Sequence, residues 1–239
     1  IRGIALGIYS DALESEIEYL ITYSKCRAIF VEDEEQADKI ISLNGSNNKV
    51  DLIIYDEPKG MHKYKDKRLI SYEDIRLLGR KIINQEEKQI HKLLDLIQEN
   101  DICIYCPTSG TTSNPKLAMI NHISLIKHAY NYLKADPKDS KDEYVSVLPM
   151  PWVMEQMYAV AKWSISRMKV NFFEDQQTMF DDLREIGPTF ILLAPRVWEQ
   201  LAADIRSKIM DSSRIKRFLY ETSMKLMKIN NNFLKNFVC

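Results

Sequence analysis

The segment from residue 105 to residue 116 holds the residue types in this sequence that are best suited to chemistry. It reads Tyr-Cys-Pro-Thr-Ser-Gly-Thr-Thr-Ser-Asn-Pro-Lys, and five of the six residues from 108 to 113 carry hydroxyl groups. Such a loop presents hydroxyl donors and backbone N–H groups around a concave anion site. Gly110 lets the backbone approach a ligand closely, and Lys116 adds a positive charge. A polyphosphate is the ligand that best fits several short donors and one ammonium group.

Two other kinds of loop have a similar composition. Gly110 and Lys116 have the spacing of the P-loop of nucleoside triphosphatases. However, Pro115 replaces the second glycine of that motif and has no N–H, and Leu117 replaces the hydroxyl residue that binds magnesium. The P-loop interpretation therefore fails. A plain Ser/Thr-rich surface turn remains the alternative, but this loop follows a buried strand, and open α/β sheets bind ligands at the carboxyl ends of strands.

The elements that position this loop alternate between strand and helix patterns, which predicts an α/β fold. The first half predicts strands at 4–9, 26–31, 50–55 and 102–105, with helices from Ser10, from Glu32 to Asn44-Gly45, and from 71 to about 100, and a surface connection at 56–70. The helix from 71 has a break expected at Gly79. The first three strands and their helices describe a βαβαβ unit with one parallel sheet.

The second half continues the same alternation. It predicts strands at 117–120, 144–148, 169–173 and 189–194 (the last one buried), and helices at 123–134, 153–167 and 178–187 and beyond 212. Gly187 is placed to cap a helix, and Pro195 suits the first turn of the next helix. We expect stacked α/β subdomains with largely parallel sheets, the first at 1–106 and the second at 107–239.

Composition narrows the classes of function. The chain has 239 residues with 33 Lys+Arg and 34 Asp+Glu, hence a net charge of −1, and this balance predicts no nucleic-acid partner. Its 45% hydrophobic content argues against a disordered chain, and no apolar run is long enough to span a membrane. Four cysteines indicate a reducing compartment. Cys103 and Cys106 form a C-x-x-C, but within a strand pattern they are expected to be ordinary strand cysteines.

Both ends of the sequence predict a piece of a longer protein. The chain begins at Ile1 inside an apolar run without a methionine, and it ends at Cys239 directly after a helical pattern. No secretory signal pattern is present at the start. We expect the N-terminus of the first subdomain to be truncated.

The loop resembles the signature loop of the adenylate-forming enzymes, Thr-Ser-Gly-Thr-Thr-Gly-x-Pro-Lys-Gly. Every position from Thr108 to Lys116 agrees except Ser113, where glycine is usual, and Leu117 departs from the glycine that follows the lysine. The stretches 7–21, 148–156 and 188–201 are similar to those of long-chain fatty acyl-CoA synthetases. The resemblance covers nearly the whole chain and identifies it as part of the N-terminal large domain of such an enzyme.

The resemblance implies a two-step reaction that uses ATP, Mg²⁺ and coenzyme A. A long-chain fatty acid forms an acyl-adenylate and releases pyrophosphate, and the thiol of coenzyme A then displaces AMP. It implies that the phosphates are held by Thr108, Ser109, Gly110, Thr111, Thr112, Ser113 and Lys116, with Thr108 also at the metal. Trp152 lines the acyl pocket on this view, and the alternative is a plain core tryptophan. Glu155 is expected to be a solvated helix residue.

Later parts of the family pattern do not occur in this sequence. These are a Tyr-Gly-x-Thr-Glu segment, an aspartate for the ribose, and a C-terminal lid domain with the adenylation lysine. We therefore expect the chain alone to be inactive. Two alternatives stay open: a fatty acyl-AMP ligase that loads a carrier protein, and a degenerate phosphate-binding module without catalysis. The expected location is cytoplasmic, and peripheral association of the whole protein with a membrane stays open.

Overall fold

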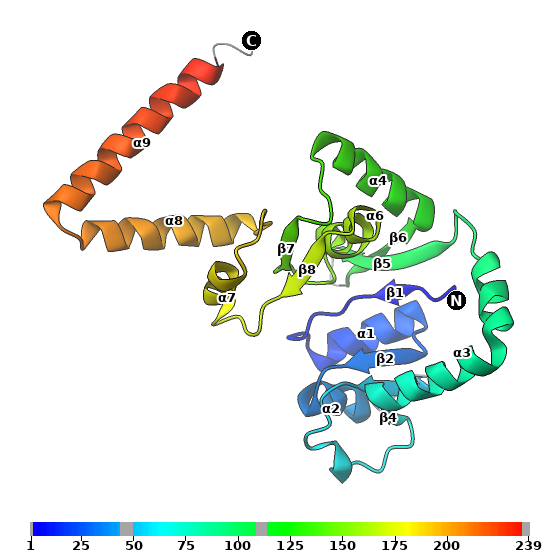
Figure 1. Cartoon of the computed structure of the whole chain (residues 1–239). Helices are drawn as coiled ribbons and strands as arrows, with labels where there is room; N and C mark the ends of the chain where they lie inside the picture. The colour runs from blue at the N-terminus through cyan, green and yellow to red at the C-terminus, as the bar shows by residue number, and fades with distance from the viewer. Residues whose placement is uncertain (1, 44–49, 109–113, 236–239) are drawn as a thin grey trace. The chain divides into compact units, whose positions relative to one another are not determined.

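The computed structural model describes residues 2–43, 50–108 and 114–235 (Figure 1). The chain forms two compact units, Ile1–Phe190 and Ile191–Cys239. In the described residues, the first unit contains every strand. The second unit contains α8 (Pro195–Met210) and α9 (Arg214–Lys235), and Pro195 stands in the first turn of α8 as predicted.

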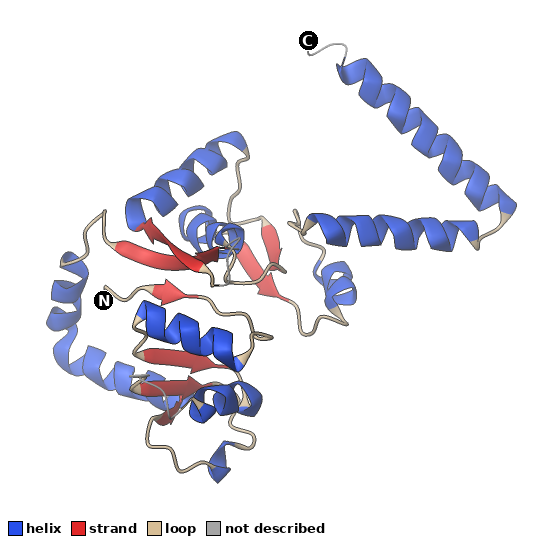
Figure 2. Ribbon diagram, turned by 180° about the vertical axis from the view of Figure 1, so that it is seen from behind, coloured by secondary structure: helices blue, strands red, loops and turns tan. Residues whose placement is uncertain are grey.

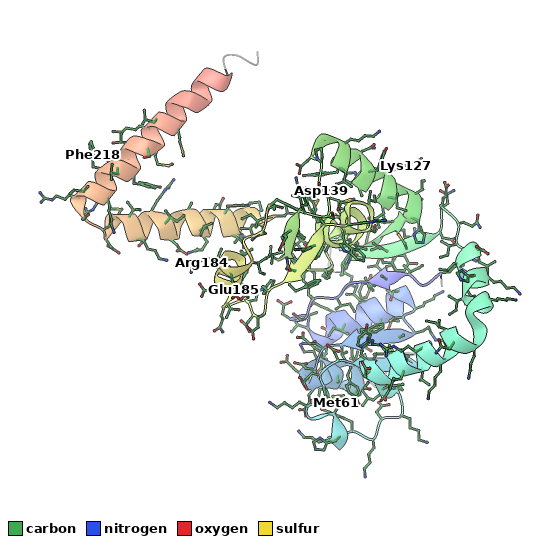
Figure 3. The ribbon with its side chains drawn as sticks, viewed as in Figure 1. Met61, Lys127, Asp139, Arg184, Glu185 and Phe218 are labelled. Carbon is green, nitrogen blue, oxygen red and sulfur yellow. The ribbon has the colours of Figure 1, made fainter. Side chains whose placement is uncertain are left out.

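The first sheet is parallel throughout and carries the main apolar core. Its strands are β2 (Ala28–Val31), β3 (Leu52–Tyr55) and β4 (Leu69–Ser71), in that order. Two helices, α1 (Glu14–Ser24) and α2 (Glu34–Ser42), pack with it, and Figure 2 shows α1 running alongside the strands. The buried core includes Ile17, Ile21, Ala37, Ile40, Ile53 and Met61, the last from η1 (Met61–Lys63) (Figure 3).

The second sheet carries the hydroxyl-rich loop. Its order is β1 (Ala5–Leu6), β5 (Ile102–Thr108) and β6 (Lys116–Asn121), with β1 parallel and β6 antiparallel to β5. The helix α3 (Tyr72–Asp95) precedes β5. Its N-cap is Ser71, whose Oγ accepts a hydrogen bond from the backbone N–H of Asp74 at 3.0 Å.

The third sheet pairs β7 (Glu143–Ser146) with β8 (Lys169–Phe172) in parallel. A continuous helical segment joins them, made of α5 (Val153–Glu155), the π-helix η2 (Gln156–Lys162) and α6 (Trp163–Ser166). The helix α4 (His122–Ala135) packs against η2. After β8, α7 (Met179–Ile186) ends at Gly187, which has a left-handed φ of 59° and is the predicted C-cap.

The predicted α/β class with largely parallel sheets is confirmed, and five details of the prediction are wrong. The strand predicted at 4–9 pairs with β5 and not with β2, so the first three strands do not form one sheet. The helix α1 begins after Leu13 and not after Ser10, and α3 continues through Gly79 without a break. The connection at 56–70 contains η1 and the first part of β4.

The fifth error is the buried strand predicted at 189–194. In the structure Phe190 forms a single bridge with Tyr144, and residues 191–235 contain no strand. The backbone N–H of Thr189 donates to the carbonyl oxygen of Glu143 at 2.9 Å, and the Phe190 ring stacks on Tyr144 at 5.1 Å. Phe190 of this apolar run packs through its ring and not as part of a longer strand. Pro195 then begins α8. The subdomain boundary between residues 106 and 107 stays a prediction.

Cys103 and Cys106 are strand cysteines, as predicted. Both lie in β5 as free thiols, Cys106 buried and Cys103 half-buried. Burial raises the pKa of both thiols, which makes them less reactive. Within the residues that the structure describes, no helix is long and apolar enough to cross a membrane.

Candidate functional site

The two ends of the hydroxyl-rich loop lie opposite each other across a β-hairpin. Thr108 ends β5, Lys116 begins β6, and the two residues are direct partners in the antiparallel register. The Thr108 hydroxyl donates a hydrogen bond to the carbonyl oxygen of Lys116 at 3.2 Å. Both side chains are exposed. The hairpin therefore places one hydroxyl and one ammonium group at the same end of the sheet.

The hairpin is fixed on one side by the first helix. The Tyr19 hydroxyl of α1 donates to the carbonyl oxygen of Pro115 at 3.2 Å, one residue before Lys116. Among the described residues, Lys116 forms no ion pair, so its charge is available to a ligand. Five of the predicted phosphate-binding residues lie outside the described residues, namely Ser109, Gly110, Thr111, Thr112 and Ser113.

Trp152 lies in a second loop, which follows β7. Its side chain is 40% exposed, as are its neighbours Met150 (38%) and Met154 (39%). The loop is tied to the helix that follows it, because the Gln156 side chain donates to the carbonyl oxygen of Met150 at 2.8 Å. The backbone N–H of Trp152 donates to the carbonyl oxygen of Pro149 at 2.9 Å. Trp152 is therefore not a core residue, and its pocket role stays a prediction.

Glu155 is completely buried, so the expectation of a solvated residue is wrong. Its carboxyl group accepts hydrogen bonds from the Tyr144 hydroxyl at 2.7 Å and the Ser146 hydroxyl at 2.5 Å, and also from the backbone N–H of Leu148. Burial raises the pKa of Glu155, and these three hydrogen bonds oppose that increase. A buried carboxyl group with three donors is a strong anchor between β7, the loop and the helix.

Lys162 is the second buried charge of the same helical segment. It is fully buried, and its Nζ has no hydrogen-bond partner among the described residues. The ammonium group lies 4.0 Å from the ring centre of Tyr132, 4.1 Å from that of Tyr158 and 5.4 Å from that of Phe190. Burial lowers the pKa of Lys162 to about 8. Aromatic faces replace part of the lost hydration, but no carboxylate of the described residues forms an ion pair with this group.

The burial of Glu155 and Lys162 was not predicted from the sequence, although the spacing of the residues around them indicates it. Glu155, Tyr158, Ala159 and Lys162 follow the spacing i, i+3, i+4 and i+7, and all four are buried. That spacing defines one face of a helix, so charges that share it with Tyr158 and Ala159 point into the core. Because Glu155 and Lys162 are charged, they were not counted among the residues of the buried helix face.

The loop that carries Trp152 is also packed against Gly7, the residue that follows β1. A Cβ atom at Gly7 would lie 2.8 Å from the backbone N of Pro151 and 3.0 Å from the carbonyl carbon of Met150. We expect Gly7→Ala to destabilise the chain by about 1–3 kcal/mol, because only backbone atoms can move away. In Gly79→Ala the new methyl group meets nothing within 4 Å, and we expect a gain of about 0.5–1 kcal/mol. Urea unfolding of both variants measures these changes, and equal effects would contradict the close contact.

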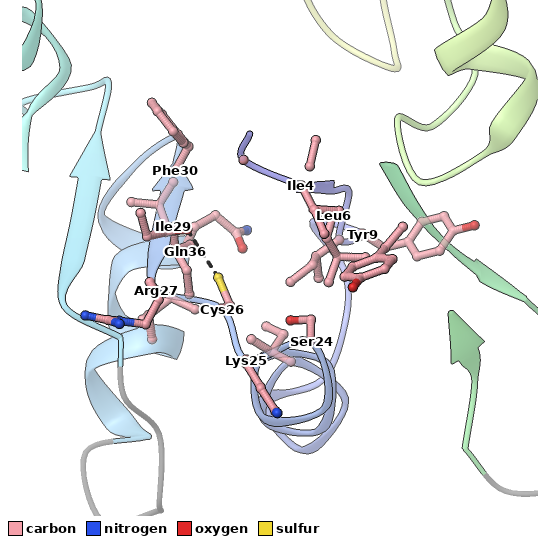
Figure 4. Close-up of a pocket in the computed structure, with 18 of the residues that line it drawn as sticks. Ile4, Leu6, Tyr9, Ser24, Lys25, Cys26, Arg27, Ile29, Phe30 and Gln36 are labelled. Carbon is pink, nitrogen blue, oxygen red and sulfur yellow. Dashed lines mark hydrogen bonds between the residues drawn. The ribbon is translucent and has the colours of Figure 1, made fainter. Parts of the chain in front are cut away.

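A cavity of about 740 Å³ lies in the first unit between β1 and β2 (Figure 4). Aliphatic side chains of both strands line it, together with Lys25, Cys26 and Arg27, which connect α1 to β2. Neither Thr108, Lys116 nor Trp152 lines it. The cavity is therefore separate from the residues that the sequence singled out for chemistry.

A catalytic metal centre made of protein side chains is not found in the part of the chain that the structure describes. No group of three or more His, Cys, Asp or Glu residues is placed there to hold a metal ion. Mg²⁺ often binds through one or two protein ligands together with phosphates and water, so this finding leaves a role for a single hydroxyl ligand.

Comparison with known proteins gives the relatives of this chain. It is 27% identical over 221 residues to the long-chain-fatty-acid–CoA ligase ACSBG2 of Homo sapiens, which is 90% of this chain and 32% of that protein. It is 26% identical over 225 residues to fatty acyl-CoA synthetase A of Dictyostelium discoideum, 91% of this chain and 32% of that protein. The chain thus spans about a third of the length of the curated relatives it matches.

Solved structures share the fold. The long-chain-fatty-acid-CoA ligase FadD1 from Archaeoglobus fulgidus superposes with a TM-score of 0.59 at 16% identity, covering 84% of this chain and 37% of that one. The anthranilate CoA ligase AuaEII in complex with anthranoyl-AMP gives a TM-score of 0.61 at 18% identity, covering 80% and 35%. The family model of the AMP-binding enzymes matches residues 1–229. This match over nearly the whole length confirms the resemblance seen in the loop, and the chain belongs to the AMP-binding enzyme family.

Proposed function

We propose that the protein carrying this chain activates a long-chain fatty acid through an acyl-adenylate, and that the β5–β6 hairpin holds the phosphates of ATP. The observation that carries the proposal is the pairing of Thr108 with Lys116, which brings two exposed polar groups to one end of the hydroxyl-rich loop. Family membership and the long-chain relatives support the reaction class. Because the chain covers a third of those relatives, the activity is proposed for the whole protein.

The proposed chemistry explains why hydroxyl donors and an ammonium group are needed. A carboxylate oxygen of the fatty acid bonds to the α-phosphorus of ATP, and the bond from that phosphorus to the bridging oxygen breaks. Pyrophosphate leaves with the electron pair, so negative charge builds on it in the transition state. Donors already in place stabilise that charge without reorganisation. Coenzyme A then attacks the acyl carbonyl carbon through its thiol, and AMP departs.

Each loop residue has a role in this proposal. Lys116 neutralises charge on the departing phosphates, and the remaining hydroxyl and amide donors would come from Ser109, Gly110, Thr111, Thr112 and Ser113. Thr108 is proposed as a ligand of Mg²⁺. Its hydroxyl proton is already donated to the carbonyl oxygen of Lys116, so the lone pairs of its oxygen are free to face a cation. Such hard oxygen ligands are those that Mg²⁺ prefers.

The acyl chain is proposed to contact Trp152. Residues 148–154 read Leu-Pro-Met-Pro-Trp-Val-Met, which is apolar throughout, and Met150 and Met154, two residues before and after Trp152, are exposed as well. Methionine and tryptophan adapt to a flexible apolar chain. An amino-acid substrate would require a charged partner for its ammonium group, and this segment contains none.

The test is ATP–pyrophosphate exchange by the complete protein with saturated acids from C2 to C18. Each buried methylene contributes about 0.8 kcal/mol, so kcat/KM is expected to rise about fourfold per carbon until further carbons are no longer buried by the protein. A maximum at acetate, or exchange only with an amino acid, would overturn the proposal. Thioester formation is measured in parallel with coenzyme A as acceptor. Adenylate formation without thioester would favour the fatty acyl-AMP ligase instead.

A further inference from the structure

Glu155 connects three segments that meet at the loop carrying Trp152. Its carboxyl group accepts hydrogen bonds from Tyr144 and Ser146, both on β7, and from the backbone of Leu148 in the loop. Glu155 itself lies on α5, directly after the loop. The carboxyl group therefore joins the strand before the loop and the helix after it, and no water reaches it.

Two further contacts hold the same loop. Gln156, the next residue after Glu155, donates to the carbonyl oxygen of Met150. Gly7, the residue after β1, lies in close contact with the backbone of Met150 and Pro151. The loop from Leu148 to Trp152 is thus held by several contacts, and Glu155 supplies the buried one.

The helix that carries Glu155 has an unusual geometry. Residues Gln156–Lys162 form a π-helix, which is rare and occurs frequently at functional sites. Gln156 starts the π-helix, and Glu155 is its N-cap residue. The π-helix is held at its far end by Lys162, whose ammonium group lies among aromatic rings and does not touch the loop.

We infer that Glu155 is a positioning residue that fixes the loop from Leu148 to Trp152 and thereby sets the acyl-chain selectivity of the enzyme. This inference rests on the proposed function, because it takes Trp152 to contact the acyl chain. Glu155 acts through the loop and does not itself touch a substrate. A carboxyl group suits this role, since its two oxygens together can accept hydrogen bonds from all three donors.

The first experiment uses Glu155→Gln in the complete protein. The amide nitrogen of glutamine donates and cannot accept a hydrogen bond, so at least one of the present hydrogen bonds must be lost or reversed in direction. We expect the ratio of kcat/KM between palmitate and octanoate to change by about tenfold, the discrimination that small changes of fit produce in an apolar pocket. The KM for ATP is expected to stay unchanged. Ser146→Ala, which removes one donor only, is expected to change the ratio in the same direction by less.

Lys162→Met is the matched control. It alters a buried charge on the same helical segment without touching the loop, so we expect its palmitate-to-octanoate ratio to stay within about twofold of the wild type. An equal loss of activity for all acids in Glu155→Gln would overturn the inference. So would a change of the ratio in Lys162→Met as large as in Glu155→Gln.

The second experiment needs no catalysis and is performed on this chain. The sequence has three tryptophans, so Trp163→Phe and Trp198→Phe leave Trp152 as the single fluorophore. Adding Glu155→Gln is expected to shift the Trp152 emission and to increase its quenching by acrylamide, whereas Lys162→Met is not. Unchanged fluorescence would overturn the inference even if the enzyme is active. Absence of adenylation with every acid would refute the proposed function, while the fluorescence still decides whether Glu155 holds the loop.

Discussion

Lys162→Met is expected to make the chain more stable than the wild type at pH 7, by about 1–4 kcal/mol. The lysine is fully buried, its Nζ has no hydrogen-bond partner in the described part of the chain, and its ammonium group is still largely protonated at pH 7. Methionine has a similar length, and its sulfur packs well against aromatic rings. The cation–π contacts with Tyr132 and Tyr158 offset part of the cost of the buried charge, which sets the lower end of the range.

The difference in the free energy of unfolding between the wild type and Lys162→Met should depend on pH in a defined range. The pKa of Lys162 is lowered by burial from 10.5 to about 8, so the unfolded chain binds this proton more tightly than the folded chain does. The contribution of Lys162 to the stability of the wild type therefore rises as the pH increases from 8 to 10.5. Other charges near this lysine are Asp136 and Asp142, which raise its pKa, and Lys138, which lowers it.

Urea unfolding at pH 7 and at pH 10.5 measures this change for both proteins. Lys134→Met is the matched control, because the Lys134 ammonium also lies over a ring, 4.7 Å from the centre of Tyr130, but on the exposed surface of α4. That control is expected to change the free energy of unfolding by less than about 0.5 kcal/mol. A Lys162→Met protein that is less stable than the wild type at pH 7, or a difference independent of pH, would contradict the prediction.

Lys116→Ala is expected to slow adenylation by the complete protein about 100- to 1000-fold, the usual effect of removing one fixed donor that faces developing charge. Lys116 is exposed, so folding should be unaffected and the loss should appear in pyrophosphate release. Lys116→Arg keeps the positive charge and should recover part of the rate. The matched control is Lys127→Ala, another exposed lysine, on α4. A loss of less than threefold in Lys116→Ala, or an equal loss in Lys127→Ala, would exclude a role at the phosphates.

The sequence predicted the fold class and the position of the loop because both depend on local patterns. Strands such as β3 and β5 are short apolar runs between polar turns, and the loop owes its identity to consecutive residue types. The pairing of β1 with β5 was not predictable in this way, because the local sequence of an apolar run carries no information about which distant strand it pairs with. The same limit explains residues 189–194, where ring stacking on Tyr144 replaced strand pairing.

The sequence singled out the loop residues of the candidate site, but it did not predict the buried residue that supports the neighbouring loop. Thr108 and Lys116 were found by residue type, and the hairpin register that brings them together is a consequence of how β5 pairs with β6. Glu155 was assigned to the surface because a carboxylate is rarely buried alone. Its burial depends on donors at Tyr144 and Ser146, which lie nine and more residues away and face it only in the folded chain.

The cavity between β1 and β2 has a consequence for how this chain behaves in solution. In the described residues each of these strands has a sheet neighbour on one side only, and both strands line the cavity. Their outer backbone amides and carbonyls are thus a template for a further extended segment, and Phe30 of β2 is 67% exposed beside them. Open strand edges readily pair with other chains, so we expect copies of the isolated chain to associate at high concentration.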